Sequence, residues 1–321
     1  MRLKTAISYN LDLICLAGIM TGDELFIDIH KEAFETWQPK LSEGIKTKLG
    51  NWVAQRGDTF ISPLVTLFIS SLVNFNNRAL IEMLSSFDEI KKSMNKTPYR
   101  LSDESYDAHF SSFTDVMIPL ISELEENGVR EYWNENKRPL IKTKCAEMDN
   151  QLAKYNMEDV LRPFANMNKA DCEIYLCAFA NPFGIKLCGN TLITDVSNPF
   201  DIVLANATHE IFHPPYNLVL MKDYVLKLAN KPWIKAVYDR QLPSAGFGSE
   251  IGFIEENIVE ALGIYVAIKL GAKIEPYTYF KDHDDGSHVI SPHFYKYLCE
   301  NEKMYDHSFE DYFIGFVNSL S

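Results

Sequence analysis

Apolar residues recur at helical spacing through the first half of this chain. Residues 3–9 are suited to a short strand, and from there to about residue 165 the pattern predicts one helix after another. The clearest apolar stripes lie in residues 57–73, 76–94 and 105–124. Such stripes belong to a core by default, so the pattern predicts a helical N-terminal region over residues 1–165.

The pattern changes in the second half. Residues 172–180 are rich in β-forming side chains, and Gly189-Asn190, between residues 185–188 and 191–196, is a two-residue hairpin signal. Helical periodicity then returns in four stretches, residues 199–213, 217–229, 250–267 and 308–320. We therefore expect an α+β fold, mostly helical, with a small mixed β-sheet next to the helix of residues 199–213. Residues 166–321 form the second predicted domain.

Composition places the chain among globular proteins and narrows its partners. With 321 residues, of which 46% are hydrophobic, the chain can build a sizeable core, in one large domain or two intimately packed ones. The net charge of −13 argues against nucleic acid or an anionic membrane as partner, because both would be repelled at long range. A run of about 18 apolar residues is absent from the sequence, which argues against a membrane-spanning helix.

Six cysteines, at positions 15, 145, 172, 177, 188 and 299, show neither C-x-x-C pairs nor the density of a disulfide scaffold. We interpret them as mostly free thiols in a reducing compartment, and we expect a cytoplasmic protein. Asn10 and Asp12 interrupt the apolar stretch after Arg2 and Lys4, so the N-terminus does not have the pattern of a signal peptide. A chain already trimmed of its leader would look the same.

The strongest chemical signal is His209-Glu210-Ile211-Phe212-His213, which matches the pattern H-E-x-x-H. Residues four apart on a helix share one face, so both imidazoles can reach one metal ion, and Glu210 lies where a metal-bound water would sit. Three fixed positions in five residues arise by accident in roughly one chain in a hundred. On a helical wheel, however, these three side chains lie opposite the apolar stripe, which favours a metal site over a chance match.

The flanking residues predict where the helix with this motif begins and ends. Asn198 is the expected N-cap, and Pro199 is suited to the first helical position. Pro214 and Pro215 should end the helix directly after His213, because proline lacks the N–H group that the helix needs.

A catalytic zinc ion usually has three protein ligands, so a third is expected elsewhere in the chain. The best candidate is Glu256, on the predicted helix of residues 250–267. Glu260 lies one turn further on the same face and can accept a hydrogen bond from a ligating histidine. Glu255 should point toward the apolar flank instead. Acidic residues near a helix start could also serve only the helix dipole and solvation.

With these residues in place, the chain resembles the gluzincin class of zinc metallopeptidases over roughly residues 170–270. The resemblance implies a zincin-like fold and a Zn²⁺ cofactor held by His209, His213 and Glu256, with Glu210 as general base and Glu260 supporting a ligand. The separation of 43 residues between His213 and Glu256 (256 − 213) is longer than in the shortest members. The double proline after His213 is a further departure.

Three other stretches carry open interpretations. If the resemblance holds, residues 191–196 form an edge strand that holds an extended peptide, or else a hairpin that only covers the core. Residues 242–249 form a loop that could close over a substrate or serve only as a connection. The histidine- and aspartate-rich residues 282–293 could supply an electrophile or a second metal site, or form an ordinary surface loop.

The sequence therefore predicts a zinc-dependent hydrolase, and in particular a peptidase that acts on a peptide or protein substrate. The alternative is a non-catalytic zinc-binding interaction or regulatory protein on a zincin-like fold. Glu210 favours the enzyme, because a purely structural zinc site has no use for that carboxylate.

Overall fold

The computed structural model describes residues 2–56, 80–86, 92, 103–156, 159–160, 171–187, 190–240, 249–283, 286–302 and 308–320. The chain divides into two compact units. The sheet unit comprises Lys4–Asn150 and Glu173–Asn198, and the C-terminal unit comprises Met1–Leu3, Gln151–Cys172 and Pro199–Ser321. The predicted division separated residues 1–165 from residues 166–321. The observed division differs from it, because the strands after residue 172 belong with the N-terminal helices. The predicted boundary itself lies outside the described residues.

The sheet unit is mostly helical, as the apolar stripes predicted. Its described elements are β1 (Leu3–Ala6), α1 (Tyr9–Ile19), α2 (Glu24–Ile29), α3 (Lys31–Trp37), η1 (Gln38–Lys40), α4 (Glu43–Arg56), α6 (Leu80–Leu84), α8 (Asp103–Glu126), α9 (Val129–Tyr132), η3 (Trp133–Lys137), α10 (Arg138–Leu152), β2 (Cys172–Cys177), β3 (Ile185–Lys186) and β4 (Thr191–Asp195). The predicted strand near the N-terminus is confirmed as β1. The stretch of residues 57–73 lies outside the described residues, and of the stretch 76–94 only residues 80–86 and 92 are described.

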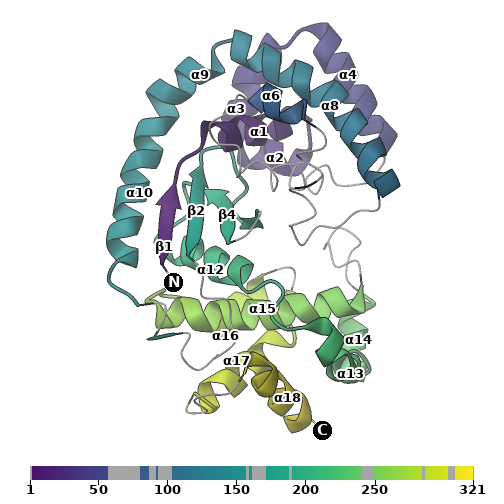
Figure 1. Ribbon diagram of the computed structural model, residues 1–321, viewed down its shortest axis with the longest axis vertical. Coiled ribbons are helices and arrows are strands. Elements are labelled where there is room, and N and C mark those ends of the chain that lie inside the picture. The colour runs from purple at the N-terminus through teal and green to yellow at the C-terminus, as the bar shows by residue number, and fades with distance from the viewer. Residues whose placement is uncertain are drawn as a thin grey trace. The chain divides into compact units, whose positions relative to one another are not determined.

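The four strands form one mixed sheet in the order β1-β2-β4-β3, so the α+β class is confirmed (Figure 1). β2 and β4 run parallel, and β3 pairs antiparallel with β4, which confirms the predicted hairpin. β4 is buried along its whole length and has a strand on each side. Of the two interpretations of residues 191–196, the peptide-binding edge strand is therefore wrong, because β4 lies between β2 and β3, and the hairpin that covers the core remains.

A buried carboxylate anchors α1 in the sheet unit. Asp12 is fully buried and accepts hydrogen bonds from the backbone N–H groups of Ala178 and Phe179, at 2.6 and 3.1 Å. The indole N–H of Trp133 donates a third, at 2.7 Å. Burial raises the pKa of Asp12 to about 7, although these hydrogen bonds oppose the shift. The residue that interrupts the N-terminal apolar stretch is therefore a structural anchor.

The C-terminal unit is built from helices. Its described elements are α12 (Phe200–Ile211), α13 (Leu218–Ala229), α14 (Pro232–Tyr238), α15 (Glu250–Lys269), α16 (Pro276–Asp282), α17 (Ser291–Glu300) and α18 (Phe309–Ser319). The caps agree with the sequence pattern: Asn217 caps α13 through its side chain, and Ser308 forms a capping box with Asp311 at α18. The expected helices over residues 217–229 and 308–320 are confirmed.

The two ends of α12 differ from the prediction. Pro199, not Asn198, is the N-cap, and the Asn198 side chain donates to Thr194 Oγ1 at 2.9 Å instead. The helix ends at Ile211, two residues before His213. Proline disfavours helical geometry in the residue before it, so Pro214 excludes His213 from the helix as well as ending it.

α15 is the central helix of the C-terminal unit and the long helix in the lower half of Figure 1. Apart from its first turns and its end, it is buried on nearly all sides, and not only along the apolar stripe that the sequence predicted. Its buried Asn257 accepts a hydrogen bond from the Ile290 N–H at 2.9 Å, and the Ser291 hydroxyl donates to the Asn257 carbonyl at 2.7 Å. These bonds join α15 to the start of α17.

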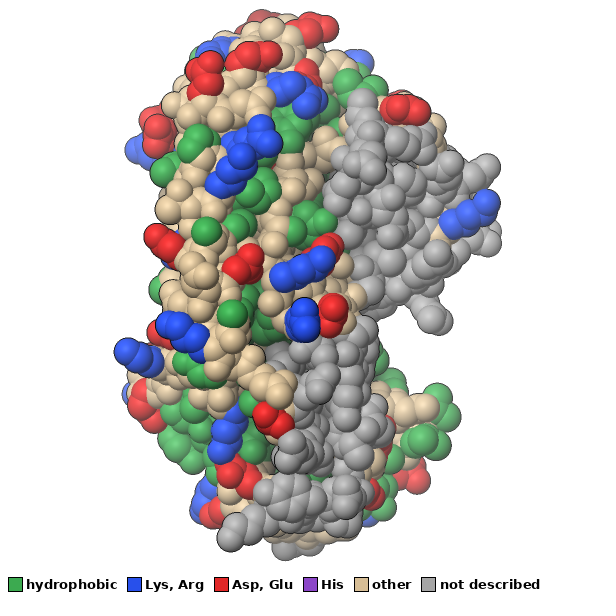
Figure 2. All heavy atoms as spheres, turned by 60° about the vertical axis from the view of Figure 1, so that its left-hand side comes forward, with side chains coloured by type: hydrophobic (Ala, Val, Ile, Leu, Met, Phe, Trp, Pro, Cys, Tyr) green, Lys and Arg blue, Asp and Glu red, His purple; other side chains and the backbone are tan. Residues whose placement is uncertain are grey.

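The charged side chains, the cysteines and the helices of the described residues can be compared with what the composition predicted. Figure 2 shows acidic and basic side chains interspersed over the described residues of the face that it presents. The cysteines at positions 15, 145, 172, 177 and 299 are free thiols, and Cys188 lies outside the described residues. None of the described helices combines the length and the apolar character that crossing a membrane requires.

Candidate metal centre

The candidate centre lies where α15 crosses the end of α12. A glycine makes this crossing close: a Cβ atom on Gly263 would lie 3.0 Å from both the Cα and the backbone nitrogen of His209. The Thr208 hydroxyl donates a hydrogen bond to the Gly263 carbonyl at 2.8 Å and so bridges the two helices. Because α15 carries Glu256 and Glu260, this contact sets how far its carboxylates lie from the histidine.

Three donor groups converge at the crossing. The Nε2 atoms of His209 and His213 lie 3.0 Å apart, and Glu256 Oε2 lies 3.3 Å from the first and 3.4 Å from the second. Ligand atoms bound tetrahedrally at roughly 2.1 Å from a metal lie about 3.4 Å from one another. The three atoms therefore have the mutual spacing of a coordination sphere, and the group could hold a metal ion.

The histidines meet by a different route from the one expected. The motif predicted two imidazoles on consecutive turns of one helix, whereas His213 lies in a bend beyond the end of α12. The backbone N–H groups of Phe212 and His213 bond to the carbonyls three residues earlier, at 3.1 and 3.4 Å. This tighter turn still carries His213 back over His209, so the two rings lie 4.8 Å apart between centroids.

Glu260 supports the first histidine from behind. Its Oε2 lies 2.6 Å from His209 Nδ1, which leaves Nε2 facing His213 and Glu256. The Glu260 side chain is only 8% exposed, so little water competes for this hydrogen bond. A carboxylate in this position fixes the tautomer and the orientation of a ligating histidine. The structure thus brings Glu260 to the place that its spacing from Glu256 suggested.

Glu255 does not point toward the apolar flank, so that expectation is wrong. Its Oε1 lies 3.7 Å from His213 Nδ1, on the side of the ring away from His209. The chain that leaves α12 after His213 runs past this side of α15, and Glu255 faces it. A helical wheel of α15 cannot show this, because the flank is occupied by a segment from another part of the chain.

The carboxylates and histidines shift one another's pKa values strongly. Burial alone would lower the pKa of His209, but Glu260 and Glu256 outweigh it and raise that pKa well above its ordinary value. Burial alone would have the opposite effect on a carboxyl group and raise the pKa of Glu260. His209 nevertheless holds the pKa of Glu260 at about 2, helped by His288 and by a hydrogen bond from Tyr279. Burial would also raise the pKa of Glu256, but His213 and His209 outweigh it and lower that pKa below its ordinary value. Without a metal, the group therefore favours protonated histidine between ionised carboxylates.

Glu210 occupies the last turn of α12, directly after His209, and is half-buried. The histidine- and aspartate-rich stretch divides. His288 is buried and lies close enough to Glu260 to help lower its pKa, whereas His283 stacks on Tyr279 and His293 lies against Trp233. Neither His283 nor His293 belongs to the metal-capable group found among the described residues. The predicted loop over residues 242–249 lies outside the described residues except for Ser249.

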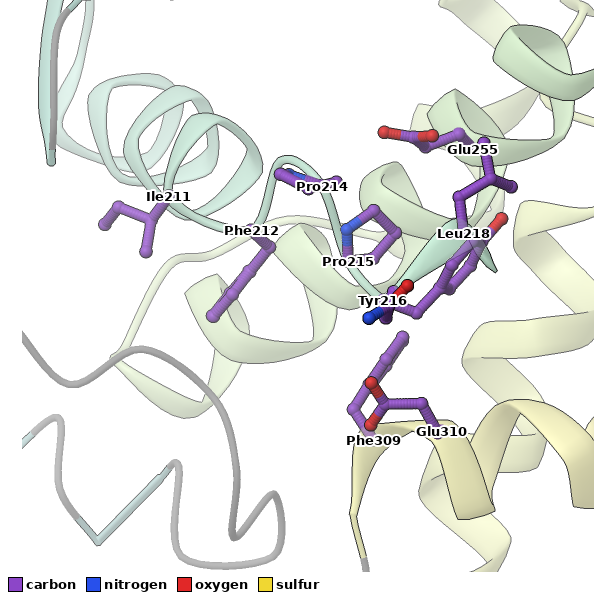
Figure 3. A pocket seen from close by; sticks show the side chains of 10 residues that line it. Ile211, Phe212, Pro214, Pro215, Tyr216, Leu218, Glu255, Phe309 and Glu310 are labelled. Atoms are coloured by element: carbon purple, nitrogen blue, oxygen red, sulfur yellow. The ribbon is translucent and has the colours of Figure 1, made fainter. Parts of the chain in front are cut away.

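A pocket of about 560 Å³ adjoins the candidate centre (Figure 3). Residues on both sides of His213, from Ile211 to Leu218, form much of its wall, and Glu255, Phe309 and Glu310 complete it. The volume is within the range of small-molecule and side-chain pockets. The sequence did not predict this pocket, because the double proline indicates the end of a helix but not that α18 lies on the other side of the pocket.

No family model, curated protein or solved structure matches this chain. The interpretation of the site therefore rests on its geometry.

Proposed function

We propose that this chain is a zinc-dependent hydrolase with a zincin-like fold, and specifically a metallopeptidase. The observation that carries the proposal is the convergence of His209, His213 and Glu256, with donor atoms 3.0–3.4 Å apart. Two imidazoles and one carboxylate with an open fourth position suit a catalytic zinc better than magnesium or calcium, which prefer oxygen donors.

Each chain residue then has a distinct role. Bound zinc would lower the pKa of its water toward ~7 and polarise the substrate carbonyl. Glu210, which follows a ligand directly, accepts the proton of the attacking water and passes it to the leaving amine. Glu260 holds His209 through the 2.6 Å hydrogen bond, so that its Nε2 stays directed at the metal.

Two features of the described residues support hydrolysis over a structural role. The ligand side chains are partly accessible, at 15–34% exposure, whereas a structural zinc site is closed by a fourth protein ligand. The adjoining pocket also offers space for a substrate next to His213. A non-catalytic zinc protein would need neither the accessibility nor the pocket.

Metal content and one isosteric substitution test the proposal. The purified protein should bind about one zinc per chain by elemental analysis. Glu210→Gln should keep the zinc but abolish hydrolysis of a peptide library, because the amide cannot accept the proton. Failure of the wild-type protein to take up zinc would refute the metal site. Zinc uptake without cleavage of any peptide would instead favour a non-catalytic zinc-binding protein.

A further inference from the structure

The segment from α16 to the start of α17 contains the histidine- and aspartate-rich stretch, and two of its residues lie close to the candidate metal centre. Tyr279 lies on α16, and His288 lies in the connection to α17. The Tyr279 hydroxyl donates a hydrogen bond to the Glu260 carboxylate, and His288 is near enough to act on the charge of that carboxylate. Both residues therefore act on the side chain that supports His209.

The packing of α16 explains how Tyr279 reaches this position. Its ring is partly buried against a small core that includes Ala205 and Ile264. Ala205 lies one turn before His209 on α12, and Ile264 lies one turn after Glu260 on α15. The ring therefore rests on both helices that cross at the centre, close to the residues that meet there. Phenylalanine could fill the same space, so packing does not explain the hydroxyl.

A buried asparagine fixes the chain around His288. The side chain of Asn257, on α15, donates to the Ser287 carbonyl at 3.4 Å and accepts from the Ile290 N–H at 2.9 Å. These bonds hold the chain on both sides of His288, which is only 4% exposed. Asn257 and Glu260 are three residues apart, so they share one face of α15. The connection to α17 is thus held over the face of α15 that carries Glu260.

Burial gives Glu260 a need for such neighbours. Its side chain is 8% exposed, and an ionised carboxylate has about four acceptor sites, of which His209 Nδ1 occupies one. A buried carboxylate with a single partner would lose its hydration without replacement and could rotate away from the histidine. The Tyr279 hydroxyl and His288 provide further polar neighbours from another part of the chain. A fixed carboxylate in turn fixes the imidazole that it contacts.

We propose that Tyr279 and His288 are positioning residues of the candidate metal centre. They hold the Glu260 carboxylate in the orientation that directs His209 Nε2 at the metal, so they act on the metal through two intervening side chains. This role of the histidine- and aspartate-rich stretch is distinct from a second metal site or an electrophile. The inference rests on the metal site of the proposed function.

Double-mutant cycles separate an action through Glu260 from a general effect on the fold. Tyr279→Phe removes the hydroxyl and keeps the ring, and His288→Gln removes the imidazole and keeps a polar side chain. Each is made alone and together with Glu260→Ala. Zinc dissociation constants are measured by competition with a chelator, and the visible absorption of the Co²⁺-loaded protein reports the coordination geometry. The matched controls are Tyr277→Phe and His293→Gln, at exposed positions of α16 and α17.

We expect Tyr279→Phe to weaken zinc binding about three- to tenfold, the effect of one hydrogen bond and less than that of removing the Glu260 side chain itself. The absorption bands of the Co²⁺-loaded protein should shift as well, because a rotated His209 ring changes the coordination geometry. His288→Gln should act in the same direction. Both effects should vanish in the Glu260→Ala background, since the intervening carboxylate is then absent. The control variants should bind zinc like the wild-type protein.

The outcomes distinguish this inference from the proposed function. Wild-type zinc affinity in Tyr279→Phe or in His288→Gln refutes the inference for that residue and leaves the hydrolase intact. A loss of the same size with and without Glu260→Ala also refutes it, because the effect then does not pass through Glu260. Losses of zinc affinity that depend on Glu260, without cleavage of any peptide, support the inference and refute the hydrolase. A wild-type protein that takes up neither zinc nor Co²⁺ refutes both.

Discussion

The helix crossing at Gly263 makes a sharp prediction for Gly263→Ala. The new Cβ atom would lie 3.0 Å from two backbone atoms of His209, and neither can move without moving α12 itself. The helices would have to separate by a few tenths of an ångström. Because α15 carries Glu256 and Glu260 while α12 carries His209, the substitution should change the metal donor spacing from outside the site.

The magnitude follows from three contributions. Alanine is favoured over glycine inside a helix by about 1 kcal/mol, which would stabilise the variant. Overpacking against a rigid backbone costs about 1–3 kcal/mol. Weakening the hydrogen bond from Thr208 to the Gly263 carbonyl costs up to ~1 kcal/mol. Together they give a net loss of up to about 3 kcal/mol in the free energy of unfolding, with the middle of the range near 1.5 kcal/mol. We also expect a drop of about tenfold in zinc affinity.

Gly252→Ala is the matched control, because it makes the same change in the same helix. Its Cβ would meet only the Ser249 hydroxyl, at an ordinary contact distance of 3.4 Å. This variant should gain up to ~1 kcal/mol and bind zinc normally. Urea unfolding and zinc titration measure both quantities. If Gly263→Ala proved as stable as Gly252→Ala and bound zinc equally well, the close crossing would not hold the site.

Three further predictions concern the candidate centre. Glu256→Ala should lose most of its bound zinc, and Glu260→Ala should lose about 10- to 100-fold in zinc affinity, whereas Glu255→Ala should keep its zinc. If Glu256→Ala bound zinc with wild-type affinity, the third ligand would lie elsewhere. Zinc affinity should also fall as the pH drops through the raised pKa of His209, by up to about tenfold per pH unit, because zinc must displace a proton. Proton release in a weakly buffered titration measures this, and a pH-independent affinity would contradict it. In the metal-free protein, the lowered pKa of Glu260, at about 2, contributes stability above its ordinary value of 4.5 that is lost as the pH falls toward 2. Glu260→Gln should abolish that part of the acid sensitivity in urea unfolding.

Local sequence determined the features that short-range interactions control. The helical periodicity of residues 217–229 and 308–320 predicted α13 and α18, and their starts coincide with the side-chain caps Asn217 and Ser308, which need only an oxygen within three residues of the backbone they serve. The hairpin of β3 and β4 followed from its turn residues. His209 and His213 came together because four residues of chain hold them close, even after Pro214 had ended the helix early.

Tertiary structure alone decided the features that depend on which distant segments meet. The sequence could not show that β4 lies inside the sheet, since a strand becomes central only when others pair on both sides. Asp12 interrupted an apolar stretch, and only its contacts with residues far along the chain explain its burial. Glu255 was assigned to an apolar flank, although the segment after His213 passes there.

The metal-capable group combines both kinds of information. Its two histidines are four residues apart, so the motif alone indicated their chemistry. Glu256 lies 43 residues after His213 (256 − 213), and its helical face could be derived from the sequence but its distance from the histidines could not. That distance is set by how closely α15 approaches α12 at Gly263. Helix periodicity fixes the direction of a side chain, whereas close packing between helices fixes what it reaches.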